Sequence, residues 1–140
     1  AFFTSHRSKI SKYAALGVAT FGPVGVDPNV KDTYGRILSS SPKKEWRNVD
    51  LIRPLLEAVG EDTPYLVETD VNAPAWAEYM YNNKNDNDGQ LNKKISSIAY
   101  ITVGTGVGVG LVIHGKPVHG MMHPEGGHVT VKPLSNDTFH

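Results

Sequence analysis

The sequence predicts an α/β protein, because short apolar runs of strand length alternate with segments that have helical spacing. Apolar runs cover 13–21 and 65–69, and each is followed by a segment that favours a helix, over 51–59 and 74–81. A β-rich stretch over 95–113 completes the order strand, helix, strand, helix, hairpin. Such an order favours a sheet with helices packed on it.

The first strand and helix have recognisable ends. The run over 13–21 stops at Gly22-Pro23, and the following 22–48 is rich in Gly, Pro, Asp, Asn and Ser, which predicts mostly loop. Apolar residues then recur with helical spacing from Leu51 to Val59. Asp50 is placed to cap this helix, and Gly60 to end it.

The second half begins with a strand over 65–69 that runs into a helix over 74–81, where Pro74 suits a first turn. The polar segment 82–94 predicts a loop. A strand over 95–103 precedes a glycine-rich segment, and Leu111 to Ile113 resume the strand pattern before a tight turn at His114-Gly115. We expect a further short strand over 129–131.

Composition narrows the possible functions. The 140 residues contain 14 basic and 14 acidic side chains, so charge gives no reason to expect a nucleic-acid or membrane partner. Without cysteine, neither a disulfide nor a Cys-based metal site can form within these residues. No stretch approaches the roughly 18 apolar residues that span a bilayer. We therefore expect a cytoplasmic protein.

The first motif is the glycine-rich segment Gly104-Thr105-Gly106-Val107-Gly108, which follows a predicted strand. Closely spaced glycines let backbone N–H groups approach a phosphate, and the threonine hydroxyl adds a donor. It lacks the Gly-Lys-Ser/Thr ending of a Walker A loop, and no helix follows as in a Rossmann fingerprint. The alternative is a glycine-rich hairpin without a ligand.

The second motif is Asp70 with Asn72, at the point where a strand ends and a helix begins. Ligands in open α/β sheets gather at such carboxyl ends. A carboxylate there can take a proton from a substrate hydroxyl, and the amide can bind the substrate. The alternative is that one of these residues only caps the helix.

The third motif is the segment 123–128, which groups two imidazoles and a carboxylate within six residues. His123, Glu125 and His128 could hold a polyhydroxyl ligand or a metal. Their spacing is not that of a helical zinc-protease motif. The alternative is an ordinary surface turn.

Together these motifs resemble the ROK family of sugar kinases, and most closely its fructokinase branch. The resemblance covers about positions 14–134, with several motifs in the family's order. The matching segments are Thr20-Phe-Gly-Pro-Val24, Tyr34-Gly35, Ser41-Pro-Lys43 with Trp46, Thr69-Asp-Val-Asn-Ala73, Tyr100 to Gly110, His114-Gly-Lys116, Gly120 and His123-Pro-Glu-Gly-Gly-His128.

The resemblance implies an actin-like, ribonuclease H-like fold with two lobes and an ATP cleft. Residues 1–95 would form the later part of the first lobe, and 96–140 the start of the second. It implies transfer of a phosphoryl group from Mg-ATP to a hexose, with fructose giving fructose 6-phosphate. The implied roles are general base for Asp70, sugar contacts for Asn72, Glu125 and His128, and phosphate binding for Gly104, Thr105 and Gly106.

His128 also matches the family's first zinc ligand, so zinc is an implied metal of the longer protein, and a homodimer its implied assembly. The family's Asp-x-Gly-Gly-Thr phosphate loop, its cysteine ligands and its adenosine segment do not occur here. Gly126 replaces the usual Met, and Glu45 the usual Gly. We expect an incomplete copy, inactive by itself. The competing hypothesis is a sugar-binding transcriptional regulator or a non-catalytic sugar-binding module of the same family.

Overall fold

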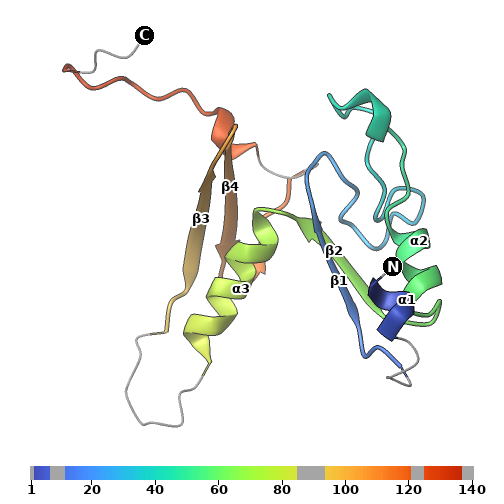
Figure 1. The fold of residues 1–140 in the computed structure, drawn as a ribbon. Coiled ribbons are helices and arrows are strands. Elements are labelled where there is room, and N and C mark those ends of the chain that lie inside the picture. Colours follow the sequence, from blue (N-terminus) through green and yellow to red (C-terminus); the bar gives the residue numbers. More distant parts are fainter. Residues whose placement is uncertain (1, 7–11, 85–93, 121–124, 137–140) are drawn as a thin grey trace.

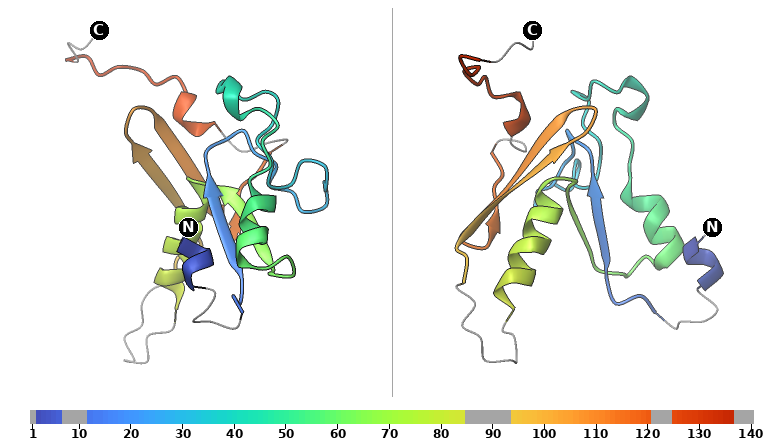
Figure 2. Two further views of the ribbon diagram at one scale, coloured as in Figure 1. Left: turned by 45° about the vertical axis from the view of Figure 1, so that its right-hand side comes forward. Right: turned by 60° about the vertical axis from the view of Figure 1, so that its left-hand side comes forward.

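The computed structural model describes residues 2–6, 12–84, 94–120 and 125–136. Its elements pack as two small sheets with helix α3 between them (Figures 1 and 2). The elements in chain order are α1 (Phe2–His6), β1 (Leu16–Thr20), the 3₁₀ turn η1 (Lys44–Trp46), α2 (Ile52–Val59), β2 (Tyr65–Thr69), α3 (Asn72–Asn83), β3 (Ser97–Val103), β4 (Val107–Ile113), β5 (Lys116–Pro117) and the 3₁₀ turn η2 (Gly126–His128).

The first sheet is a parallel pair. Strand β1 lies beside β2 in a register that joins Leu16 to Tyr65 and Thr20 to Thr69, with α2 in the connection between them. One face of this pair contacts α2 and the segment 24–37. The buried side chains at this contact are Val24, Ile37, Ile52 and Val67.

Helix α2 begins and ends as the sequence predicts. The Asp50 carboxylate Oδ1 accepts hydrogen bonds from the backbone N–H groups of Ile52 and Arg53, both at 3.0 Å. These bonds satisfy two of the N–H groups that a helix start leaves unpaired. At the other end Gly60 adopts φ +123°, a conformation that favours glycine, and its N–H donates to Leu56.

The second sheet is a hairpin with a short third strand. Strands β3 and β4 are antiparallel from Ser97 opposite Ile113 to Val103 opposite Val107, and β5 pairs with the end of β4. Helix α3 packs on this sheet, with Ala75 and Val112 fully buried. The predicted α/β class is therefore confirmed, while the division into lobe segments 1–95 and 96–140 stays a prediction.

Several elements differ from the predictions in their bounds or in their presence. Helix α3 spans Asn72–Asn83, two residues longer at each end than predicted. It begins early because Thr69, and not Pro74, organises its start. Strand β4 begins at Val107, inside the glycine-rich segment, so the turn is confined to residues 104–106. The predicted strand over 129–131 is wrong: these residues are exposed and pair with no strand in the described part of the chain.

None of the helices within the described residues is long and apolar enough to cross a membrane.

Candidate functional site

Asp70 lies where the two parallel strands end. Its backbone N–H donates to the carbonyl oxygen of Thr20 at 2.8 Å, which extends the β1–β2 pairing by one bond, and its side chain is exposed. In Figure 1 the carboxyl ends of β1 and β2 point the same way as the tip of the β3–β4 hairpin. This places Asp70 where open α/β sheets usually present their ligands.

The start of α3 is capped by Thr69. The Thr69 hydroxyl oxygen accepts a hydrogen bond from the N–H of Asn72 at 3.1 Å, and Thr69 itself is buried. Because Thr69 supplies this bond, the helix start does not need the Asp70 carboxylate as its cap. The alternative explanation of Asp70 as only a capping residue loses its support.

Asn72 is fully buried and joins α3 to the hairpin. Its side-chain Nδ2 donates to the carbonyl oxygen of Val118 at 3.0 Å, and its Oδ1 accepts from the N–H of Leu111, also at 3.0 Å. The structure therefore gives Asn72 a packing role, which sequence reasoning missed. Its predicted contact with a sugar stays a prediction.

The glycines between residues 104 and 110 divide into two groups. A Cβ atom on Gly110 would lie 2.0 Å from the backbone oxygen of Val71, and one on Gly108 would lie 2.8 Å from the Val71 side chain. These two glycines allow β4 to pack closely against the start of α3. Around Gly104 and Gly106, by contrast, the space within 4 Å is open.

The turn itself is exposed. The N–H of Gly104 donates to the carbonyl oxygen of Gly106 at 2.9 Å, and Thr105 between them faces solvent. Neither crowding nor a left-handed backbone requires glycine at 104 and 106. A ligand that approaches the backbone closely is one physical reason for glycine at such positions.

Glu125 and His128 lie together across η2. The His128 Nδ1 is 3.2 Å from the Glu125 Oε2, and both side chains are largely exposed. Turn η2 packs closely on β4. The contact is so close that a Cβ on Gly127 would collide with the carbonyl oxygen of Val107. The predicted sugar loop therefore lies beside the hairpin that bears the glycine turn. His123 lies outside the described residues.

A metal centre is not assembled within the residues that the structure describes. They contain no group of three or more His, Cys, Asp or Glu side chains that could hold an ion. For His128 the described neighbour is Glu125, and a tetrahedral zinc site needs further ligands. The zinc assignment of His128 stays a prediction about the longer protein.

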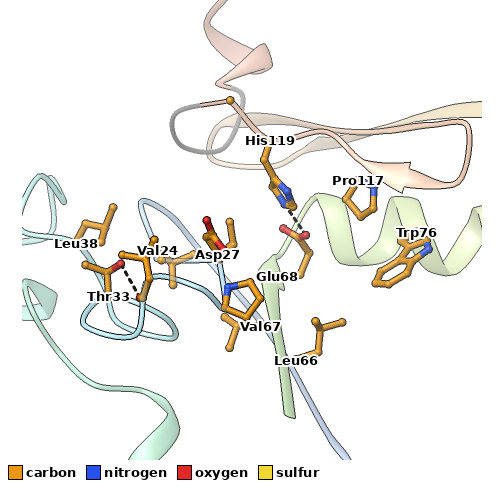
Figure 3. Close-up of a pocket in the computed structure, with 15 residues that line it drawn as sticks. Val24, Asp27, Thr33, Leu38, Leu66, Val67, Glu68, Trp76, Pro117 and His119 are labelled. Carbon is orange, nitrogen blue, oxygen red and sulfur yellow. Dashed lines mark hydrogen bonds and ion pairs between the residues drawn. The ribbon is translucent and has the colours of Figure 1, made fainter. Parts of the chain in front are cut away.

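A cavity of about 530 Å³ is lined by Glu68 of β2 and by His119, among other residues, and Asp70 does not line it. Figure 3 shows Glu68 and His119 on one side of it, with Val24, Asp27 and Thr33 on the other. The Glu68 Oε2 and the His119 Nε2 are 2.7 Å apart. Sequence reasoning missed this pair, although an acidic residue within an otherwise apolar strand segment was a signal for it.

Comparison with known proteins places these features in context. Over all 140 residues the chain is 35% identical to a fructokinase of Streptococcus mutans, and over 116 residues it is 39% identical to a fructokinase of Zymomonas mobilis. These matches cover 100% and 83% of this chain. The chain spans only 42% and 35% of the lengths of those two relatives.

A more distant similarity links the chain to a regulator. It is 25% identical over 123 residues to the xylose repressor of Bacillus subtilis, of which it covers 28%.

Among solved structures, a ROK hexokinase from Thermus thermophilus superposes with a TM-score of 0.56 and 31% sequence identity. The match covers 86% of this chain and 35% of the hexokinase. It confirms the actin-like α/β fold that the resemblance implied, as a part of that fold. The model of the ROK family matches residues 1–138, so the chain belongs to the ROK family.

Proposed function

We propose that the complete protein carrying this chain phosphorylates a hexose with ATP, and that fructose is the preferred sugar. The main support is the exposed carboxylate of Asp70, which lies at the carboxyl end of a parallel strand pair in a chain of the ROK family. The similarity to two fructokinases supports the choice of sugar.

In this proposal Asp70 is the general base. A neutral sugar hydroxyl is a weak nucleophile, so a carboxylate that accepts its proton assists the attack on the γ-phosphorus. The sugar oxygen forms the new P–O bond, and the bond to the β-phosphate oxygen breaks with its electron pair leaving on ADP. The exposed Asp70 side chain can reach a bound substrate without rearranging the core.

We assign the phosphate contacts to Gly104, Thr105 and Gly106. The open space around both glycines fits a phosphate close to the backbone, with the Thr105 hydroxyl as a further donor. ATP bound with Mg²⁺ would supply the phosphoryl group and neutralise its charge. Asp70 is an exposed carboxylate at this end of the sheet and could face such an ion.

We assign the sugar contacts to Glu125 and His128, with Asn72 as a third predicted contact. A carboxylate accepts hydrogen bonds from sugar hydroxyls, an imidazole can donate or accept them, and several such contacts give selectivity. Both side chains are largely exposed, so a ligand can approach them from solvent.

The test is sugar-dependent ADP release by the complete protein with fructose, mannose and glucose, beside its Asp70→Asn variant. Loss of a general base lowers kcat by roughly 10²- to 10⁴-fold. Asp62→Asn is the matched control, because Asp62 is also an exposed aspartate but lies in the turn before β2. Equal kcat values for the two variants would refute the role of Asp70.

The second candidate function is a sugar-responsive regulator, which the similarity to a xylose repressor favours. It predicts that a sugar raises the melting temperature of the complete protein while no ADP is released. We also propose the homodimer that the family resemblance implies. Light scattering on the eluted protein tests it, since a monomeric mass would contradict the proposal.

A further inference from the structure

Two buried polar side chains flank Asp70 and bond to the same short segment. Glu68 precedes Asp70 in β2, and Asn72 follows it in α3. Glu68 contacts the side chain of His119, while Asn72 donates to the backbone of Val118. The stretch that carries the candidate base is therefore tied on both sides to residues 118–119.

The Glu68–His119 contact is a directed hydrogen bond. The Glu68 side chain is 8% exposed and that of His119 is 35% exposed. An ionised carboxylate only accepts hydrogen bonds, so the His119 Nε2 carries the proton in this contact. The second carboxylate oxygen, Oε1, accepts from the N–H of Thr69 at 2.7 Å. Both oxygens of Glu68 are thus engaged, one by its own strand and one by His119.

Burial of the Glu68 carboxylate is unfavourable unless the group is paired, because burial removes it from water. The pair connects β2 to the segment between β5 and η2, 51 residues later in the chain. Glu125 and His128 follow His119 in the sequence by six and nine residues.

We propose that Glu68 and His119 are positioning residues that fix the sugar-contacting segment relative to Asp70. This inference rests on the proposed function. The Asn72 bond attaches the backbone at Val118, and the Glu68 bond fixes the next residue, so together they hold the described residues that precede η2 in the sequence. Sugar affinity should depend on the pair more than ATP affinity does.

The experiment compares steady-state kinetics and melting temperatures of the complete protein and three variants. The double variant Glu68→Leu with His119→Leu replaces the pair by apolar side chains. His119→Gln keeps an N–H donor near the position of Nε2. Glu57→Gln is the control, because Glu57 is an exposed acid on α2 that pairs with Arg53.

We expect the double variant to raise the KM for fructose about tenfold, the effect of losing roughly one charge-assisted hydrogen bond. Its KM for ATP should stay close to that of the unmodified protein, while its melting temperature should fall, because the buried N–H of Thr69 loses its bond to Glu68 Oε1. His119→Gln should recover most of the sugar affinity, because the donor is kept. Glu57→Gln should match the unmodified protein in all three measurements.

An unchanged KM for fructose in the double variant would overturn the proposal, as would equal increases in KM for fructose and for ATP. Should the double variant not fold, Glu68→Gln decides, since it keeps the shape and removes the charge. A KM for fructose equal to that of Glu57→Gln then overturns the proposal. If the unmodified protein turns over no sugar, the proposed function fails first, and the positioning role fails with it.

Discussion

Replacing Asn72 by alanine should destabilise the protein strongly, although it removes only one small side chain. Asn72 is fully buried, and its amide pairs the N–H of Leu111 and the carbonyl oxygen of Val118, each at 3.0 Å. In the alanine variant both backbone groups, which are part-buried, lose their partner. The contact between α3 and the hairpin then contains two unpaired polar groups.

The magnitude follows from these two groups. Leaving a buried donor or acceptor unsatisfied costs about 1–3 kcal/mol, and because these two bonds are part-buried we take the lower end for each, so the free energy of unfolding should fall by roughly 2 kcal/mol. Asn82→Ala is the matched control in the same helix. Its Nδ2 donates to Glu78 at 2.8 Å on the exposed surface, where water can replace the bond. The control should change stability by less than about 0.5 kcal/mol.

Urea unfolding of the complete protein, followed by circular dichroism, measures both variants. Equal midpoints for Asn72→Ala and Asn82→Ala would refute the reasoning, because the two bonds of Asn72 would then contribute nothing beyond a surface bond. The same samples test the predicted sugar contact of Asn72. A ligand that binds only the folded state raises its stability, so loss of the fructose-induced shift in Asn72→Ala alone would support that contact.

Three further variants are tested with the same unfolding measurement. Gly110→Ala should lower the free energy of unfolding by at least about 1–3 kcal/mol, because its Cβ would lie 2.0 Å from the Val71 carbonyl oxygen. Gly106→Ala, with open space around it, should leave stability unchanged and raise the KM for ATP, and a normal KM would contradict the phosphate role. Asp50→Ala should cost about 1 kcal/mol through the lost cap of α2, and an unchanged urea midpoint would contradict the capping role.

Local features of the sequence predicted the elements well. The Gly22-Pro23 stop after β1, the Asp50 cap and the Gly60 end of α2 each depend on residues within a few positions of one another. The tight turn at His114-Gly115 is confirmed, with φ values of 49° and 79°. These signals come from interactions between residues close in sequence, so they can be recognised in a single sequence.

The polar contacts that organise the site could not be predicted in this way. The partners of Asn72 lie 39 and 46 residues further along the chain, and His119 lies 51 residues after Glu68. No periodicity or motif in one segment specifies which distant backbone group it will meet. The same limit applied to the glycines, since only the approach of Val71 separates the crowded Gly108 and Gly110 from the open Gly104 and Gly106.

The pattern of burial around Asp70 strengthens its assignment as the candidate base. Glu68, Thr69 and Asn72 are all buried polar residues, and each has a hydrogen bond that explains its polarity. Asp70 lies among them with an exposed carboxylate, and within the described residues neither the helix start nor the core depends on it. Precise placement of a base requires neighbouring side chains that are held in place by their own hydrogen bonds. The structural explanations that compete with catalysis therefore apply to the neighbours of Asp70 and not to Asp70.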